Sequence, residues 1–326
     1  MNKLKLHSTV LILVSMLFSI SAFAQDYTFT VLGSKGTNTK GSSAIKVGAK
    51  IKDGETVTVG PDGYLGLAHK SFKTLEITKP GEYKVSDLES MLGNADGDLA
   101  SKYAKFVMDE LTSGNSSSSR FNRKAKTGSV TRSLHKKPIL FLMPVDENGI
   151  SKTSKVLADS KITIKWYVNN PNILDSKSNI QYKFVVKDGS PLNIGKVIYD
   201  TEITGESVTV DLSDARFNDS KMLLYQVVVM NNSKEVTSDE LMLNIVNPMH
   251  AGQMGTEVKI LEKDETALGK MVLAKYFEEH NLIANAIHAY EEAIEISEAP
   301  EFIASYNSFL EFYQLSSSSR EVSAGK

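Results

Sequence analysis

The chain has no cysteine among its 326 residues, and neither sign of charge prevails in it. Without cysteine, the chain has no disulfide bonds, thiolate metal sites, thiol nucleophiles or lipid-carrying cysteine. The formal net charge is −2, which argues against a whole-chain nucleic-acid binder, because such proteins are clearly basic. The hydrophobic fraction of 41% is sufficient for ordinary buried cores.

Motifs for catalysis are also missing. The sequence has no Walker phosphate loop, no G-x-S-x-G nucleophile elbow and no H-E-x-x-H zinc motif. The short pattern S-x-x-K occurs twice, but neither copy is expected to open a helix, as this chemistry requires. His280, His288 and Glu292 lie near one another along the chain, in too loose a pattern for a metal site. We therefore predict a protein that is not an enzyme and that needs no cofactor or metal.

The first 24 residues have the pattern of a secretory signal peptide. Lys3 and Lys5 give a positive start, Val10–Ile20 is apolar, and Ala22-Phe23-Ala24 supplies small residues for cleavage. We predict a mature chain that begins at Gln25 and resides in the periplasm. The alternative is an uncleaved membrane anchor, for which the apolar run is short, since a spanning helix needs about 20 residues. No other segment is predicted to span a membrane.

Residues 25–112 are predicted to form a β domain followed by a helix. Apolar residues alternate with polar ones in short runs, which places them on one face of a sheet. The alternating pairs are Val57 and Val59, Leu65 and Leu67, Leu75 and Ile77, and Tyr83 and Val85. Turn sequences such as Pro61-Asp62-Gly63 separate the runs and indicate a compact sandwich or barrel. Ser86-Asp87-Leu88-Glu89 then predicts a helix that begins with a capping box.

The same stretch carries a family resemblance. AIKVGAKIKDGETVTVGPDGYLGLAHKSFKTLEITKPGEYKV resembles the FecR-type β domain of bacterial envelopes over about sixty residues. The matching positions are glycines and apolar residues rather than reactive groups. Iron-signalling regulators with this domain place a cytoplasmic segment and a membrane span before it, whereas here a signal peptide precedes it. The resemblance therefore implies a fold rather than a signalling role.

Residues 113–137 are predicted to be a basic, serine-rich linker. They include seven lysines or arginines and no acidic residue. Such a segment lacks the apolar surface that folding requires. It is either a soluble tether or an electrostatic arm for an anionic polymer or an acidic partner. The candidate electrostatic residues are Arg120, Arg123, Lys124, Lys126 and Arg132.

Residues 138–248 are predicted to be a second β domain. Seven short alternating runs with turn residues between them are typical of an immunoglobulin-like sandwich. The predicted strands are Ile139–Val145, Lys161–Val168, Gln181–Lys187, Val197–Ile203, Ser207–Leu212, Leu223–Met230 and Glu240–Val246. The runs KITIKWYV, QYKFVVKDG and LLYQVVV resemble the fibronectin type III pattern. This resemblance implies that Trp166 is the buried core tryptophan and Tyr225 the tyrosine of a late strand.

Residues 249–265 are predicted to be a second linker, and residues 266–315 to be helical. Apolar residues at helical spacing indicate two helices joined near His280-Asn281, and Pro300 is expected to open a third. The small residues Ala274, Ala286 and Ala293 give the hairpin a resemblance to a tetratricopeptide repeat. Repeats of this kind need about three copies to stand alone, so this piece must pack against its own sandwich or a partner. Residues 316–326 are expected to be a mobile tail.

The predicted fold class combines mainly β N-terminal and central domains with an α-helical, tetratricopeptide-like C-terminal segment. We expect a non-enzymatic, exported envelope protein that acts as an interaction scaffold or sensor for an envelope protein partner. The alternative is a cell-wall or polysaccharide binder that uses the basic linker to hold an anionic polymer.

Candidate partner-binding residues are Tyr276, Tyr290 and Tyr306, because aromatic side chains are favoured anchors at interfaces. The alternative is that these tyrosines only fill the core of the helical hairpin. Residues 255–326 carry six basic and thirteen acidic residues, so their charge opposes that of the basic linker. We therefore expect the linker to rest against the helical hairpin until a partner displaces it.

Overall fold

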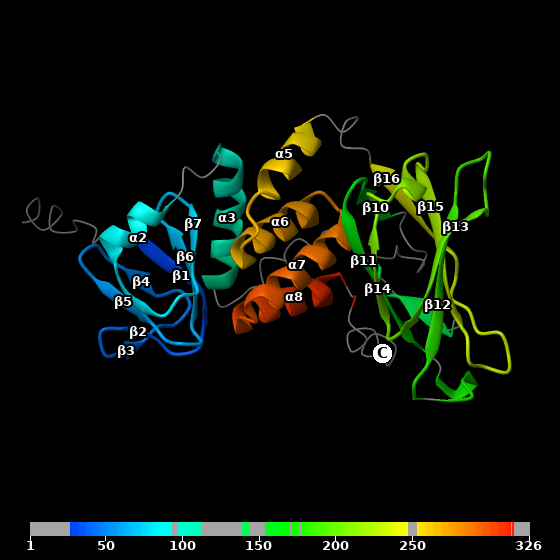
Figure 1. The fold of residues 1–326 in the computed structure, drawn as a ribbon, viewed down its shortest axis with the longest axis horizontal. Coiled ribbons are helices and arrows are strands. Elements are labelled where there is room, and N and C mark those ends of the chain that lie inside the picture. The colour runs from blue at the N-terminus through cyan, green and yellow to red at the C-terminus, as the bar shows by residue number, and fades with distance from the viewer. Residues whose placement is uncertain are drawn as a thin grey trace, which may run out of the picture.

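The computed structural model describes residues 27–92, 97–112, 138–143, 154–246 without 170 and 177, 253–313, and 315. The predicted signal peptide, the basic linker and the residues after Leu315 lie outside these ranges. The described residues form three parts (Figure 1). We call residues 27–112 the N-terminal unit, residues 138–246 the central β unit and residues 253–315 the helical block.

The N-terminal unit has two four-stranded antiparallel sheets, with the orders β4-β1-β6-β7 and β3-β2-β5-β8. The strands are β1 (Phe29–Lys35), β2 (Asn38–Lys40), β3 (Ser43–Ala44), β4 (Lys50–Ile51), β5 (Thr56–Val59), β6 (Tyr64–His69), β7 (Thr74–Ile77) and β8 (Gly81–Lys84). The predicted alternation is confirmed in β5, where Val57 and Val59 are buried between half-exposed threonines. A bulge between Val31 and Gly33 changes the register of β1 against β6.

Two helices complete this unit: α2 (Val85–Met91) and α3 (Gly97–Thr112). The predicted capping box is wrong. Strand β8 runs directly into α2 at the buried Val85, so Lys84 is the N-cap and no side chain caps the helix. Helix α3 buries Tyr103 and Val107, and it contacts α6 and α8 rather than only its own sheets.

The central β unit has a five-stranded sheet, β10-β16-β15-β12-β13, and a three-stranded sheet, β14-β11-β9. The strands are β9 (Ile139–Phe141), β10 (Ser154–Leu157), β11 (Lys161–Val168), β12 (Gln181–Asp188), β13 (Val197–Thr204), β14 (Ser207–Asp211), β15 (Met222–Val229) and β16 (Leu241–Val246); short 3₁₀ turns lie at Pro171–Ile173 and Ala215–Phe217. Six of the seven predicted strands are confirmed to within one residue at each end. The first, predicted as Ile139–Val145, is a strand only over Ile139–Phe141, and residues 144–145 lie outside the described ranges. Strand β10 was not predicted, because four residues are too few to show a period.

The core of the central β unit lies between its two sheets. Trp166 on β11 is 1% exposed, as predicted. Its ring stacks on Phe184 of β12 and meets Tyr182 edge-on, with ring centroids 6.2 Å and 5.6 Å away. Tyr225 on β15 is also buried, in contact with Phe141 of β9. Aromatic contacts thus join strands of both sheets.

The helical block consists of α5 (Gln253–Leu261), α6 (Ala267–Glu279), α7 (Ile283–Ser297) and α8 (Pro300–Phe312). The predicted helix pair is confirmed, and Thr266 caps α6 by accepting a 3.0 Å hydrogen bond from Gly269 N–H. Pro300 opens α8, as predicted. Helix α5 lies in the predicted linker at 249–265. Its buried face is only Gly255, Val258 and Leu261, which is a weak helical signal.

The order of the three parts in space differs from their order along the chain. The helical block lies between the two β units, although it follows both in the sequence (Figure 1). Its core cluster includes Leu32, Tyr64 and Ala68 from the N-terminal unit and Leu157 from the central β unit. Ala284 of α7, in turn, belongs to the core of the central β unit. The helices therefore pack against both β units of their own chain.

Replacing Trp166 with Ala should destabilise the central β unit by about 3–5 kcal/mol, the usual cost of deleting a core aromatic. Trp166 is the only tryptophan, so tryptophan fluorescence of the wild type reports on this core alone, and circular dichroism measures the loss of stability in the variant. The native protein should emit at short wavelength and shift to the red when it unfolds in urea. Native emission at the wavelength of a fully solvated indole would contradict the described packing.

Candidate functional site

The three tyrosines predicted as partner anchors lie in the interior of the helical block. Tyr276, Tyr290 and Tyr306 are 0%, 1% and 7% exposed. The rings of Tyr290 and Tyr306 stack with centroids 5.6 Å apart, and both contact Phe309. In this conformation they fill the core, which is the alternative that the sequence leaves open, and a partner does not reach them.

Each of these tyrosines donates its hydroxyl hydrogen to a glutamate. Tyr276 donates to Glu257 at 2.8 Å, Tyr290 to Glu278 at 3.3 Å and Tyr306 to Glu291 at 2.9 Å. Because buried hydroxyl groups are costly without a partner, these bonds allow large aromatic rings to fill the core. Three of the acidic side chains of the helices thus accept hydrogen bonds from tyrosines of the core.

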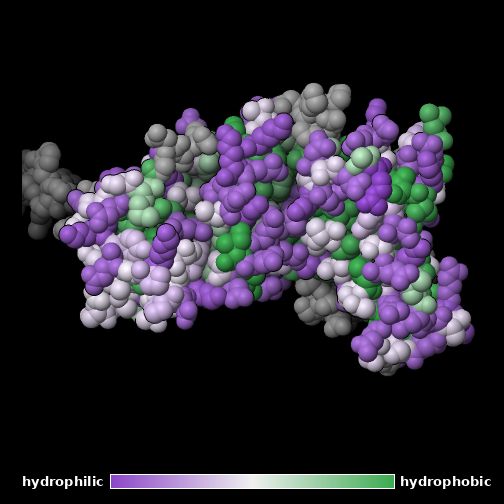
Figure 2. Space-filling model, viewed as in Figure 1, coloured by the Kyte–Doolittle hydropathy of each residue, from purple (hydrophilic) through white to green (hydrophobic). Residues whose placement is uncertain are grey.

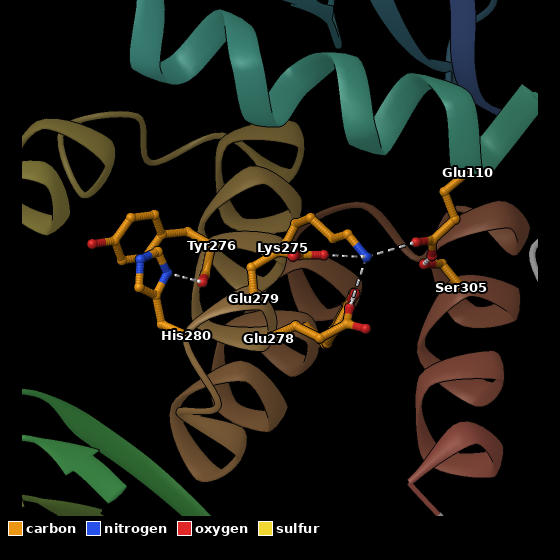
Figure 3. Close-up of polar contacts among 8 residues, drawn as sticks. Glu110, Lys275, Tyr276, Glu278, Glu279, His280 and Ser305 are labelled. Carbon is orange, nitrogen blue, oxygen red and sulfur yellow. Dashed lines mark hydrogen bonds and ion pairs between the residues drawn. The ribbon is translucent and has the colours of Figure 1, made fainter. Parts of the chain in front are cut away.

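A buried cluster of charged side chains lies where α3 meets α6 and α8 (Figure 3). Lys275 of α6 is 3% exposed, and its Nζ lies 3.1 Å from Glu278 Oε2 and 3.4 Å from Glu110 Oε2. Glu110 belongs to α3, and its other oxygen accepts a hydrogen bond from Ser305 Oγ of α8. The cluster therefore ties the N-terminal unit to two helices of the block.

Sequence reasoning missed this cluster. The pair of Lys275 and Glu278 is visible as an i,i+3 spacing on one helix. Glu110 lies 165 positions away from Lys275, and no local pattern joins the two. Only the packing of α3 against α6 shows that the three charges share one buried site.

The cluster has the residue types of a catalytic site, but a substrate has no path to it in this conformation. A lysine with a neighbouring carboxylate can act as a base or form a Schiff base when a substrate reaches it. Here the space bounded by Val107, Leu111, Met271 and Tyr290 has no room for a water molecule. The arrangement therefore fixes how α3 lies on the helical block. We call such a set of buried polar contacts between two parts of the molecule a joint.

A second joint connects strand β7 to the start of α6. Glu76 Oε1 accepts hydrogen bonds from Tyr64 Oη at 2.6 Å and from Leu268 N–H at 2.5 Å. The carboxylate thus lies at a helix N-terminus, where the free amide groups favour negative charge. Burial is the largest influence and raises the pKa of Glu76, against the hydrogen bonds from Tyr64 and from the amides of Leu268 and Ala267, which lower it.

A third joint connects α7 to the central β unit. Asn285 is 1% exposed, donates to Ser160 Oγ at 2.7 Å and accepts from Leu157 N–H at 3.1 Å. One turn further along α7, His288 lies 3.2 Å from Thr163 Oγ1. Burial lowers the pKa of the His288 imidazole. Both faces of the helical block are therefore fixed by buried polar contacts.

The remaining features considered from the sequence are the basic linker residues, a metal site and a membrane span. Arg120, Arg123, Lys124, Lys126 and Arg132 lie outside the described residues. In the part of the chain that the structure describes, no cluster of histidine and acidic side chains is arranged to hold a metal ion. No helix within those same ranges has the length and apolar character needed to cross a membrane.

The clearest exposed apolar group lies at the end of the β12–β13 hairpin. Leu192, Ile194 and Val197 are 95%, 68% and 51% exposed, and we call them the apolar tip. Figure 2 shows hydrophobic surface at this end of the molecule, away from the helical block. The turn has a defined conformation, because Gly195 N–H donates to Asp188 O at 2.9 Å and Asn193 N–H to Ser190 O at 3.1 Å. The hairpin thus presents aliphatic side chains to solvent on an ordered support.

Replacing Lys275 with Met should destabilise the protein by about 3–5 kcal/mol, because it leaves buried carboxylates without their cation. Lys270 on the same helix provides the matched control. It pairs with Glu292 at 3.0 Å in a more exposed position, so Lys270→Met should cost at most about 1 kcal/mol. Urea denaturation measures both losses. Equal, small losses would show that the cluster does not stabilise the fold.

Glu76 predicts a pH-dependent stability. A carboxyl whose pKa is raised by folding contributes stability below its unfolded pKa and loses it as the pH rises through the folded pKa. Glu76→Gln removes this titration and keeps an acceptor for Leu268 N–H. Urea denaturation should therefore show the variant gaining stability relative to the wild type as the pH rises above the ordinary glutamate value of 4.5. A difference that stays constant with pH would contradict the raised pKa.

No protein-family model, no curated protein and no solved structure matches this chain. The contacts, burial and charges of its own residues are therefore the basis for a functional proposal.

Proposed function

We propose that this protein is a non-enzymatic, exported envelope protein that acts as an interaction scaffold, with two β modules held at a fixed spacing. The observation that carries the proposal is the position of the helical block. The block packs against both β units through buried contacts, so it acts as a rigid spacer rather than as a free tail.

The contacts on the N-terminal side are close and specific. Phe302 of α8 lies against Gly33 of β1, where an added Cβ would come within 3.2 Å of its ring. Tyr64 of β6 meets the same ring edge-on, with centroids 6.0 Å apart. On the other side, Lys165 of β11 forms an ion pair with Glu291 of α7. Rigid-body movement of either β unit would break packed contacts of this kind.

We propose an immunoglobulin-like or fibronectin type III-like sandwich for the central β unit. The support is its strand arrangement, in which β9, β11 and β14 form one sheet and β12, β13, β15 and β16 lie in the other. Strand β10 adds to the second sheet by parallel pairing with β16. The buried Trp166 and Tyr225 lie on β11 and β15, between the sheets. Sandwiches of this type commonly serve as binding modules in cell-surface proteins.

We propose a FecR-type β domain with a trailing helix for residues 25–112, and a tetratricopeptide-like hairpin with a third helix for residues 266–315. The glycines of the first pattern support it where they form turns: Gly48 and Gly54 have φ values of 81° and 75°. The hairpin is supported by Ala274, Ala286 and Ala293, which are all 0% exposed. Small buried residues let the two helices pack closely.

The proposed location is the periplasm, with cleavage before Gln25. The support is the basic, apolar and small-residue order of residues 1–24. A chain without cysteine suits an oxidising compartment, because no thiol is available for unwanted pairing.

We propose that the apolar tip contacts a protein partner that has an apolar surface of its own. Exposed aliphatic clusters on an ordered support mark interaction sites more often than isolated exposed residues do. The tip has no net positive charge: its one lysine, Lys196, lies near Asp188, and Lys187 beside the tip is paired with Glu240 at 2.5 Å. A protein contact therefore fits this surface better than an anionic polymer does.

Site-specific photo-crosslinking in cells tests the proposal. A photoreactive amino acid at Leu192 should crosslink one defined envelope protein, and the same residue at the exposed Glu202 of β13 should not. Ile194→Ser should reduce the Leu192 crosslink several-fold, because it removes a second aliphatic group of the tip. No crosslink at Leu192, or equal crosslinks at both positions, would contradict a contact at the tip. Salt-sensitive retention of the purified protein on cell-wall sacculi would favour the polysaccharide-binding alternative.

A further inference from the structure

Among the residues that the structure describes, the N-terminal unit shares no sheet with the rest of the molecule. Within the described residues, its strands pair only with one another, between Phe29 and Lys84. The strands of the central β unit likewise pair only within residues 139–246. The N-terminal unit therefore meets the helical block through side-chain packing and isolated hydrogen bonds, as two separate proteins do.

We call this contact the docking interface. Its centre is apolar: Tyr103 and Val107 of α3 pack with Tyr276 of α6, and the rings of Tyr103 and Tyr276 have centroids 5.2 Å apart. Two largely buried polar contacts fix its register, namely the ion pair of Glu110 with Lys275 and the bond from Leu268 N–H to Glu76. The exposed ion pair of Lys35 with Glu298 at 2.6 Å lies at its edge. An apolar centre with a few fixed polar contacts is the anatomy of a protein–protein interface.

The covalent connection across the docking interface is long. Residues 113–137 join the N-terminal unit to the central β unit, a segment with a reach of about 80–90 Å at full extension. By contrast, only residues 247–252 separate β16 from α5, and α7 packs directly on β10 and β11. The central β unit and the helical block thus stay together, and the N-terminal unit is the part that is able to exchange.

We propose that the docking interface also forms between two copies of this chain, so that each N-terminal unit docks on the helical block of the other copy. The contacts that define the interface are the same in both arrangements. The covalent link within one chain raises the effective concentration of the two surfaces, and this favours the closed monomer. Exchanged dimers should therefore form when the protein refolds at high concentration, and they should be retained after dilution because the interface must open to release them. This inference does not depend on the proposed function.

The cysteine-free chain allows a direct crosslinking test. One full-length variant carries Lys35→Cys and another carries Glu298→Cys; these side chains are 41% and 69% exposed, so the changes should cost little stability. The two variants are unfolded together in urea, refolded at high concentration and treated with a short bismaleimide. Exchange should give covalent dimers that contain one copy of each variant, and variants refolded separately and then mixed should give several-fold fewer.

A matched control pair lies within one hairpin of the central β unit. Lys183 and Asp200 form an ion pair at 2.7 Å with similar exposure, 37% and 45%, across neighbouring strands. Co-refolded Lys183→Cys and Asp200→Cys variants should give only background dimers, because this hairpin does not exchange. The double variants K35C/E298C and K183C/D200C should each crosslink within one chain and melt like the wild type, which verifies the reach of the reagent and the fold. If the Lys35 and Glu298 pair then gives no more mixed dimers than the control pair, the exchange proposal is wrong.

Discussion

Helix α6 is enclosed on almost every side, and the arrangement of the whole molecule follows from this enclosure. Of its thirteen residues, only Lys270 and Glu279 are not buried. A surface helix shows one apolar stripe, whereas a helix that is buried all round must have neighbours in every direction. Here α3 and strand β7 come from the N-terminal unit, and α5 and α7 come from the helical block itself. The hairpin is therefore complete only when segments from both halves of the chain surround it.

Because α6 is enclosed, each polar side chain on it loses its contacts with water and destabilises the fold unless it has a partner. Lys275 and Glu278 are both 3% exposed, and they form an ion pair with each other on one turn of the helix. Glu110 adds a second carboxylate from a different unit. Buried ion pairs often add little net stability, but a pair with a missing member is strongly destabilising. The cluster thus favours the placement of α3 in which the buried Glu110 meets the Lys275 cation.

Much of the local structure could be predicted from the sequence, because it depends on short-range patterns. The strand with Tyr225 alternates strictly between half-exposed and buried residues, the strand with Trp166 follows the same alternation except at the buried Thr163 and at its last residue, and Pro300 marks the start of α8. The elements that the sequence did not predict are very short, have a weak pattern, or depend on contacts between distant parts of the chain. Strand β10 has four residues, α5 has a narrow apolar face, and the predicted cap at Ser86 was overridden by the buried Val85. The tyrosines of the helical hairpin were visible from the sequence, but their burial depends on α3 and the β units.

The placement of the helical block shows why contacts between distant parts of the chain could not be predicted from the sequence. A helical hairpin with too few repeats must cover its apolar surface, and the sequence pattern is equally compatible with a partner protein or with another part of the chain. The choice is made by contacts such as Glu110 with Lys275 and Leu268 with Glu76, which join positions 165 and 192 residues apart. Such contacts close long loops, and the entropy lost in closing these loops opposes the packing that the contacts gain. A short-range sequence pattern does not show where contacts of this kind form.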